Sequence, residues 1–289
     1  MEFKNYLEKT AKEIDREIEK ILKGWRDEVK NISPKLVPLL DLFIKSCQGG
    51  KRIRGVLVKL GYELIRSKEK KILKVAAAYE IFHAAILAHD DIIDQSPTRR
   101  DQPSLYKQFS AMAEKSFASS ALKALGGDHY GISQAICLAD AGFFLAIKII
   151  AESKFEEQFK NQAVSLFSKT MVDTAIGQML DISHGERELV AKYKTARYTI
   201  AGPLKIGAVL AGANGKLVKL LDNFGENLGI AFQIRDDILD GEVESVDEAN
   251  VKALEYVMKA KKVIPGVTND PNLGKLLEQM CEYLVERNK

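Results

Sequence analysis

The sequence predicts an all-α protein built as a helical bundle. Apolar residues recur mostly at spacings of three and four, and long stretches carry no turn signal, a pattern typical of amphipathic helices. The 7 prolines and 1 tryptophan among 289 residues do not indicate a β-rich or proline-rich chain. An apolar content of 46% suffices for one large core or two modest ones. Because no linker rich in Gly, Ser or Pro is visible, we expect a single domain over residues 1–289.

The first half of the chain contains three predicted helices, over residues 1–30, 52–64 and 73–94. The first is amphipathic, since Phe3, Leu7, Ile14, Ile18 and Leu22 lie roughly along one side. Pro34 and Pro38 predict a break after it, and the loop Gln48-Gly49-Gly50 precedes the second helix. The third helix is mostly apolar and ends in a cluster of aspartates, closed by Ser96-Pro97-Thr98.

The second half contains further predicted helices, while residues 101–130 show no clear pattern and contain the break Gly126-Gly127. Pro203 predicts a kink or break within its helix, and Pro265-Gly266 predicts the separation of two short, charged C-terminal helices. The longer helical patterns cover residues 131–152, 155–184, 187–212 and 216–240, the last of which ends in a second aspartate cluster.

Charge and cysteine content exclude several classes of protein. The formal charge of +3, from 43 basic and 40 acidic residues, gives no case for nucleic-acid binding. Cys47, Cys137 and Cys281 are scattered and odd in number, as expected of reduced thiols in the cytoplasm. The charged N-terminus does not resemble a signal peptide. The apolar stretch 141–150 is too short for a membrane span and carries Lys148, so we expect a soluble protein without stable membrane insertion.

The aspartate cluster at residues 90–94 is the first candidate for chemistry. Asp90 and Asp94 are four residues apart, so on a helix they project from the same face, and Asp91 lies beside them. Three neighbouring carboxylates repel one another unless a cation neutralises them. Magnesium suits them, because it binds carboxylates and keeps positions open for phosphate oxygens. Taken alone, the cluster is as well explained by a solvated helix end.

A second cluster with the same DDxxD spacing makes a chance origin the minor interpretation. Asp236, Asp237 and Asp240 again close an apolar helical segment. If their helices are juxtaposed, the two clusters could face each other across the mouth of a cavity and share magnesium ions.

Basic residues near the same segments indicate an anionic substrate. Lys51, Arg52 and Arg54 follow a glycine loop near a helix N-terminus, where free N–H groups and the helix dipole favour anions. Arg99 and Arg100 follow the first cluster. Any single basic pair is most simply a solvated face; the joint placement favours a diphosphate site.

Together these motifs resemble the trans-type polyprenyl diphosphate synthases, and among them archaeal short-chain geranylgeranyl diphosphate synthases. The motifs GGKRIR, HDDIID with the following RR, GQMLDI, KT and FQIRDDILD occur in the family's order and rough spacing. The resemblance covers about residues 40–240. It implies an isoprenoid-synthase-type helical bundle around a central apolar cavity, a magnesium cofactor and a homodimer, without indicating which helices meet in the dimer.

The resemblance also implies roles for individual residues. The magnesium ligands and their supporting carboxylates would be Asp90, Asp91, Asp94, Asp236, Asp237 and Asp240. The diphosphate of isopentenyl diphosphate would be held by Lys51, Arg54, His83 and Arg100. The allylic diphosphate would contact Arg99, Lys194 and Gln233, with Thr195 beside the reacting carbon. Gln178 and Asp181 match a motif that lines the same cavity. Without the family pattern, His83 would be read as a core histidine.

The implied chemistry is ionisation of an allylic diphosphate, followed by attack of the isopentenyl double bond. Cations stabilise the departing diphosphate, and a dry pocket keeps water from the allylic cation. The residues one and two turns before Asp90 would form the wall for the growing chain: Ala85 and Ile86 are small or medium, while Phe82 and Tyr79 are bulky and deeper. At about 1.5 Å per residue, this floor favours a product of twenty carbons. Plain core packing of Phe82 and Tyr79 stays open.

The sequence departs from the family after Asp240. The usual loop with two Gly-Lys pairs is absent, and Asp101 and Gly55 stand where the family has Gly and Pro. Either a mobile segment is missing from this sequence, which we favour and which an intact mass above 32.2 kDa would support, or the deletion is real. Farnesyl or farnesylgeranyl diphosphate synthase, class I terpene cyclase and a non-catalytic partner subunit stay as alternatives.

Overall fold

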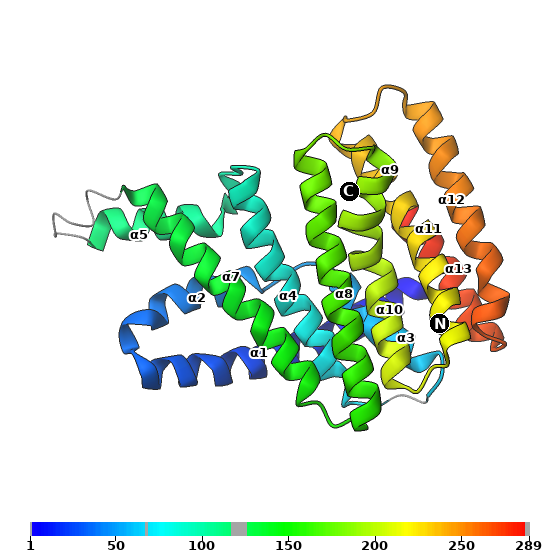
Figure 1. Cartoon of the computed structure of the whole chain (residues 1–289), viewed down its shortest axis with the longest axis horizontal. Helices are drawn as coiled ribbons and strands as arrows, with labels where there is room; N and C mark the ends of the chain where they lie inside the picture. The colour runs from blue at the N-terminus through cyan, green and yellow to red at the C-terminus, as the bar shows by residue number, and fades with distance from the viewer. Residues whose placement is uncertain (1, 67–68, 117–125, 287–289) are drawn as a thin grey trace. The chain divides into compact units, whose positions relative to one another are not determined.

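The computed structural model describes residues 2–66, 69–116 and 126–286, and within these ranges helices dominate (Figure 1). The all-α prediction is therefore confirmed. The one sheet in these ranges is an antiparallel pair of two-residue strands, β1 (Thr98–Arg99) and β2 (Gln102–Pro103). The helices are α1 (Phe3–Ile32), η1 (Pro34–Leu36), α2 (Val37–Ser46), α3 (Ile53–Glu63), α4 (Ile72–Ile93), α5 (Leu105–Ser116), α7 (Gly127–Ala151), α8 (Glu157–Ile182), α9 (Arg187–Val190), η2 (Ala191–Ala201), α10 (Gly202–Leu210), α11 (Gly215–Asp240), α12 (Val246–Val267) and α13 (Pro271–Val285).

The chain divides into two compact units. Unit 1 comprises residues 1–12, 51–76 and 150–289, and unit 2 comprises residues 13–50 and 77–149. Each unit is assembled from segments that are far apart in the sequence. The single polyprenyl synthase domain over residues 1–289 stays a prediction.

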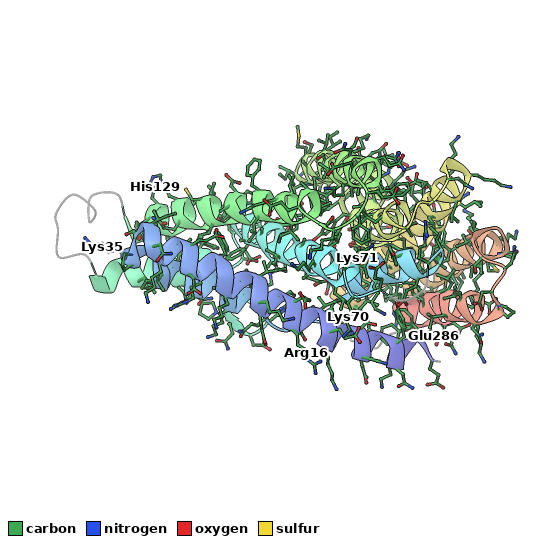
Figure 2. All side chains as sticks on the ribbon, turned by 90° about the horizontal axis from the view of Figure 1, so that it is seen from below. Arg16, Lys35, Lys70, Lys71, His129 and Glu286 are labelled. Atoms are coloured by element: carbon green, nitrogen blue, oxygen red, sulfur yellow. The ribbon has the colours of Figure 1, made fainter. Side chains whose placement is uncertain are left out.

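Helix α1 confirms the predicted amphipathic pattern. All five apolar residues on its predicted face are at most 3% exposed, and Ile14 is fully buried. Arg16, between two of them, is exposed and projects away from the ribbon, as does His129 at the start of α7 (Figure 2).

Unit 1 is a set of closely packed helices in which α8, α10, α11 and α12 run side by side (Figure 1). Helices α3 and α10 approach so closely that a Cβ atom on Gly61 or Gly207 would overlap the backbone of the facing helix. Burial of apolar surface between helices supplies most of the stability of such a bundle.

The helical pattern over residues 187–212 is divided between three elements, where the sequence predicts one helix with a kink or break at Pro203. The middle element, η2 (Ala191–Ala201), is a π-helix of 11 residues directly before Gly202 and Pro203. A proline lacks the N–H that an α-helix requires of it and crowds the preceding turn. A wider π turn accommodates that loss.

The C-terminal helices differ from the prediction. Pro265 lies inside α12, which continues to Val267, so the predicted break at Pro265-Gly266 is wrong. The break falls at residues 268–270, where the side chain of Asp270 accepts hydrogen bonds from the N–H groups of Asn272 and Leu273 and caps α13. Such a cap starts a helix more effectively than a proline near the end of α12 stops one.

The connection between α11 and α12 is short. Gly241 adopts a φ of 75° and caps α11, and the hydroxyl of Ser245 accepts a hydrogen bond from the N–H of Glu248 to cap α12. The 289-residue chain therefore folds with a tight turn at the position where the resemblance implies an additional segment. A pocket of about 370 Å³ borders this turn, between Ile230, Ile234, Asp237 and residues 243–252.

Unit 2 contains α2, most of α4, α5 and α7. Gly142 on α7 faces the side chains of Phe43 and Ala85, so that a Cβ there would lie 3.0 Å from each. Two helices, α4 and α7, are long and apolar enough by composition to cross a membrane, a weak signal that core helices also give. Within the apolar window of each, 72% of α4 and 28% of α7 is buried.

Candidate active site

The first acidic motif lies at the C-terminal end of α4, in unit 2. Asp91 is 3% exposed, whereas Asp90 is half-buried and Asp94 is exposed. Asp90 and Asp94 are separated by one helical turn, since the N–H of Asp94 donates to the carbonyl of Asp90. The helix thus presents two accessible carboxylates and buries the third.

Arg99 returns to this motif through the β1–β2 hairpin. Its Nε donates to Oδ1 of Asp91 over 2.8 Å, and its Nη2 donates to Oδ2 of Asp90 over 3.1 Å. Burial raises the pKa of Asp91, and Asp90 and Asp94 add to this, against the lowering effect of Arg99. The ion pairs keep the pKa of Arg99 raised although burial acts to lower it. Arg99 therefore neutralises the motif in this structure.

The hairpin turn explains one departure from the family pattern. Arg100 and Asp101 have φ values of 53° and 59°, as a tight two-residue turn requires. Glycine adopts this conformation without strain, and Asp is one of the few other residues that tolerate it.

Arg100 lies against the glycine loop that precedes α3. Its Nη1 donates to the carbonyl of Gln48 over 3.1 Å, and a Cβ on Gly50 would lie 3.0 Å from its Nη2. Arg99, Arg100 and Asp91 also line a pocket of about 170 Å³ with Gln48 and Gln102. The structure thus gathers both arginines and the first motif around one pocket.

The second acidic motif lies at the end of α11, in unit 1, and is joined to the Lys194-Thr195 pair on η2. The hydroxyl of Thr195 donates to Oε1 of Gln233 over 2.6 Å, and Nε2 of Gln233 donates to Oδ1 of Asp237 over 2.7 Å. Lys194 forms an ion pair of 2.6 Å with Asp181. Four of the predicted site residues and Asp181 are therefore directly connected.

Two further site residues of unit 1 also contact η2 or its surroundings. Nη2 of Arg54 donates to Oγ1 of Thr199 over 2.9 Å, and its guanidinium lies 4.4 Å from the centroid of the Tyr198 ring. Nε2 of Gln178 is buried and finds no hydrogen-bond partner in the described part of the chain. A ligand oxygen could satisfy that donor.

The residues fit a magnesium ion by their chemistry. Within the described ranges, no three His, Cys, Asp or Glu side chains are gathered as a ready-made metal site. Magnesium does not require one, because it is bound by one or two carboxylates together with water and substrate phosphates. The mutual effect of Asp90 and Asp94 on the pKa of Asp91 shows that the first motif favours a cation.

The four predicted chain-length residues lie on α4 upstream of the first motif. Tyr79 and Ala85 are fully buried, Phe82 is 4% exposed, and Ile86 is half-buried. The ring of Phe82 stacks on Phe143 of α7 with centroids 4.8 Å apart. Phe143 also contacts His89, so it is a further candidate for the floor that the sequence pattern did not single out.

The predicted site residues fall into two groups, one in each unit. The group in unit 2 comprises His83, Asp90, Asp91, Asp94, Arg99 and Arg100; the group in unit 1 comprises Lys51, Arg54, Lys194, Thr195, Gln233, Asp236, Asp237 and Asp240. That the two acidic motifs face each other stays a prediction, as do the roles of the individual residues.

Comparison with known proteins gives consistent matches. A family model described as polyprenyl synthetase matches residues 38–250. The chain is 26% identical to the geranylgeranyl diphosphate synthase of Sulfolobus acidocaldarius over 271 residues, which cover 90% of this chain and 73% of that protein. It is 29% identical to the geranylgeranyl diphosphate synthase of Methanosarcina mazei over 201 residues, which cover 66% of this chain and little more than half, 55%, of that protein.

Solved structures share the fold. The crystal structure of geranylgeranyl pyrophosphate synthase from Corynebacterium glutamicum, complexed with isoprenyl diphosphate and magnesium, superposes with a TM-score of 0.88 at 21% identity, covering 98% of this chain and 99% of that one. The geranylgeranyl pyrophosphate synthetase of the archaeon Geoglobus acetivorans superposes with a TM-score of 0.77 at 25% identity, covering 97% and 99%. These likenesses confirm the predicted isoprenoid-synthase-type fold.

One alignment bears on the short connection after Asp240. The alignment with the Geoglobus acetivorans synthase extends over 339 positions and covers 96% of this chain and 97% of that protein. Because this chain has 289 residues, that relative carries residues without a counterpart here. The family model nevertheless matches well over half of this sequence, across both acidic motifs, and the chain belongs to the polyprenyl synthetase family.

Proposed function

We propose that this chain is a magnesium-dependent prenyltransferase that condenses isopentenyl diphosphate with allylic diphosphates, head to tail, into a short-chain all-trans prenyl diphosphate. The observation that carries the proposal is the hydrogen-bonded connection from Thr195 through Gln233 to Asp237. It joins the pair expected at the allylic substrate to the second acidic motif, which neither helix packing nor solubility requires.

The proposed product is geranylgeranyl diphosphate. The names of the relatives in Sulfolobus acidocaldarius and Methanosarcina mazei support this length, and so do the bulky, buried side chains of Phe82 and Tyr79. Farnesyl and farnesylgeranyl diphosphate are the neighbouring alternatives.

In the proposed reaction the C–O bond of the allylic diphosphate breaks and its electron pair leaves with the diphosphate. Magnesium, when bound, would neutralise the negative charge that grows on this leaving group. Lys194 and Arg99 would share that task, each released from its present carboxylate partner by the incoming diphosphate. Charge-assisted hydrogen bonds of this kind are shorter and stronger than neutral ones.

The second substrate is proposed to bind through Lys51, Arg54, His83 and Arg100. Its double bond forms the new C–C bond with the allylic cation, and the proton that is then lost goes to the departed diphosphate. Arg54 is held by Thr199 and Tyr198, and Arg100 by the carbonyl of Gln48. Both guanidinium groups are thus oriented before substrate arrives, which reduces the entropy lost on binding.

A homodimer in the cytoplasm completes the proposal. The three cysteines are free thiols, with Cys137 exposed, as the reducing cytoplasm allows. The apolar surface of α8 that would form the dimer is treated in the Discussion.

A non-catalytic subunit is the second candidate, because the short connection between α11 and α12 leaves out the lysine-bearing segment of the family. Class I terpene cyclases are disfavoured by the glycine loop with Lys51 and Arg54, which serve a second diphosphate.

The test incubates the pure protein with magnesium, labelled isopentenyl diphosphate and allylic starters of five to fifteen carbons. Asp90→Ala and Asp236→Ala should each abolish elongation, while Asp128→Ala, an exposed carboxylate paired with Lys107, should not. Release of diphosphate without elongation would favour a cyclase. No reaction by the full chain would favour the non-catalytic subunit.

The chain-length role is tested by Phe82→Ala. Removal of this ring should deepen the pocket by roughly one turn of α4, about 5 Å, and lengthen the product by about one isoprene unit. Phe109→Ala, which removes another buried ring in unit 2, is the control for general destabilisation, about 3–5 kcal/mol in such cases. An unchanged product with Phe82→Ala would assign the ring to core packing alone.

A further inference from the structure

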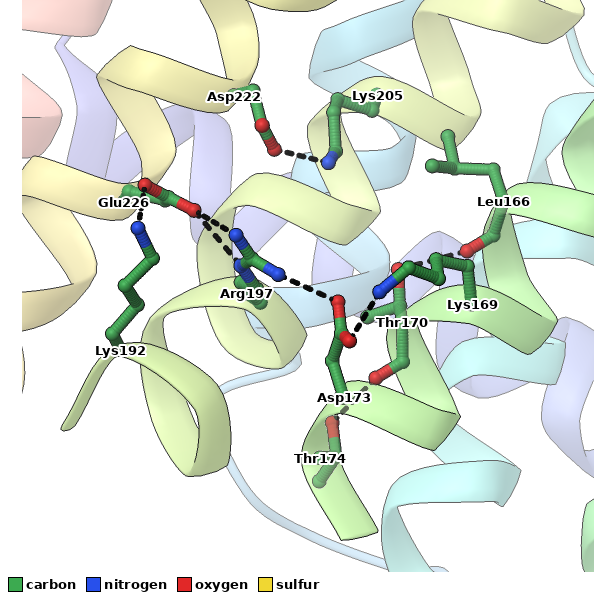
Figure 3. Close-up of polar contacts among 10 residues, drawn as sticks. All are labelled: Leu166, Lys169, Thr170, Asp173, Thr174, Lys192, Arg197, Lys205, Asp222 and Glu226. Atoms are coloured by element: carbon green, nitrogen blue, oxygen red, sulfur yellow. Dashed lines mark hydrogen bonds and ion pairs between the residues drawn. The ribbon is translucent and has the colours of Figure 1, made fainter. Parts of the chain in front are cut away.

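Arg197, on η2, lies at the centre of a charged network that the proposed chemistry does not use (Figure 3). Its Nη1 donates to Oδ2 of Asp173 on α8 over 2.7 Å, and its Nε donates to Oε1 of Glu226 on α11 over 2.8 Å. Lys169 also pairs with Asp173, and Lys192 lies 2.9 Å from Oε2 of Glu226. One guanidinium thus joins η2 to both helices that flank it.

The network is largely withdrawn from water. The side chain of Asp173 is 6% exposed, and those of Arg197 and Glu226 are 20% and 19% exposed. Although burial acts to raise the pKa of Asp173, hydrogen bonds from Lys169 and Arg197 hold it below the usual value. Removal of Arg197 would leave a buried carboxylate short of a partner, which is costly.

The same segment is pressed against its neighbours on either side of Arg197. A Cβ on Gly177 of α8 would overlap the backbone of Lys194, and a Cβ on Gly229 of α11 would overlap that of Ala196. The ion pairs of Arg197 and these close backbone contacts therefore determine the position of residues 194–197. Lys194 and Thr195 lie three and two residues before Arg197.

A π-helix is rare and is found mostly at functional sites, because its geometry is poorer than that of an α-helix. An 11-residue stretch needs outside support to persist. We propose that Arg197 is a positioning residue, which holds η2 between Asp173 and Glu226 so that Lys194 and Thr195 stand where the allylic diphosphate binds. The inference rests on the proposed function and adds a residue to it.

The structure offers a matched control in the same view. Lys205 on α10 forms an ion pair with Asp222 on α11, one helical turn before Glu226 (Figure 3). This pair also joins two helices of unit 1 and is partly buried, but it does not involve η2. Loss of it reports what an ion pair contributes to the bundle in general.

The experiment compares Arg197→Met, Arg197→Lys and Lys205→Met in the full chain. For the allylic substrate we expect kcat/KM to fall about 10- to 100-fold in Arg197→Met, since small misplacements have effects of this size. Most of the loss should lie in kcat. Arg197→Lys should recover only part of it, because an ammonium cannot replace the planar guanidinium that pairs with two carboxylates. Lys205→Met should keep wild-type kinetics.

Amide hydrogen exchange of residues 191–201 supplies a readout that does not depend on activity. It should accelerate at least tenfold in Arg197→Met and stay unchanged in Lys205→Met. Glu226→Gln serves as a milder variant if Arg197→Met does not fold. Equal melting temperatures and equal exchange for the Arg197 and Lys205 variants, with kcat/KM unchanged, would overturn the proposal. Wild-type protein that fails to elongate would instead refute the proposed function, while the exchange comparison would still decide the role of Arg197.

Discussion

At the scale of single residues, the absence of a side chain decides where functional groups lie. Gly49 and Gly50 have φ values of 73° and 85°, which glycine adopts without strain. The guanidinium of Arg100 occupies the space next to Gly50. The GG pair thus shapes the loop and also receives an arginine from a distant part of the chain.

Gly50→Ala should therefore impair both stability and function. The φ of 85° alone costs a side-chain-bearing residue about 1–2 kcal/mol, and the new methyl group would displace Arg100. We expect kcat/KM for isopentenyl diphosphate to fall roughly tenfold, about 1.4 kcal/mol of lost binding in the transition state. Gly126→Ala is the matched control, because Gly126 has a φ of 76° and open space where a Cβ would be. An equal loss of activity in both variants would contradict the displacement of Arg100.

The sequence predicted which residue types belong to the site better than it predicted their partners. Spacing along a helix placed Asp90 and Asp94 on one face, because that relation is local. It could not show that Arg99 returns to Asp90 and Asp91, since the hairpin depends on left-handed conformations at Arg100 and Asp101. The contact of Arg197 with Asp173 and Glu226 likewise arises from packing between helices.

At the scale of elements, periodicity predicted the long helices and missed the irregular ones. The predicted range 216–240 agrees with α11 (Gly215–Asp240) to within one residue, because a strong apolar face and a glycine at Gly241 mark it. The π geometry of η2 leaves no such mark, since its register differs only by one residue per turn. Pro265 misled the prediction for α12 because it stands close to the helix end, where little is lost.

Gly177→Ala tests the close approach of α8 to η2. The added Cβ would overlap the backbone of Lys194, and overpacking of this kind typically costs 1–3 kcal/mol, roughly, in unfolding free energy. Gly24→Ala, on an exposed position of α1 with nothing within 4 Å, should instead stabilise by about 0.5–1 kcal/mol, because alanine is the better helix former. Urea unfolding measures both. A stabilised Gly177→Ala would show that α8 and η2 can separate at no cost.

At the scale of the whole molecule, buried carboxylates link stability to pH. Asp173 has a pKa below its usual value in the folded protein, despite burial, because Lys169 and Arg197 donate to it. An acid whose pKa is lowered on folding adds stability above its unfolded pKa, and this is lost as pH falls below about 4. Asp91 acts in the opposite sense, because burial raises its pKa and protonation relieves the cost.

The corresponding prediction compares wild type with Asp173→Asn between pH 6 and pH 3. Wild type should be the more stable at pH 6, and its advantage should shrink as the pH falls below about 4. Unfolding free energies from urea titrations at each pH provide the measurement. Because all other acids are common to both proteins, their contributions cancel in the difference. A difference that does not change with pH would show that Asp173 stabilises by packing rather than by charge.

The expected homodimer needs an apolar surface, and α8 offers the better of two. Val172, Ile176 and Met179 lie along one face of α8 and are 56%, 44% and 66% exposed. Every exposed residue between positions 172 and 179 is apolar. The exposed face of α12 carries Val251 and Leu254 but also Lys252, Glu255 and Lys259. Because the cores of protein interfaces are depleted in charged residues, we assign the dimer contact to α8.

Ile176→Glu combined with Met179→Glu should convert the dimer to a monomer. Two charges introduced into a two-fold interface face their own copies, so four carboxylates would lose water without gaining partners, at a cost of several kcal/mol. Light scattering after size exclusion should show the mass fall from twice 32.2 kDa to 32.2 kDa. Val251→Glu with Leu254→Glu, at positions 59% and 57% exposed on α12, should leave the dimer intact. Dissociation by the α12 pair and not by the α8 pair would move the interface to α12, and a wild-type monomer would refute the homodimer itself.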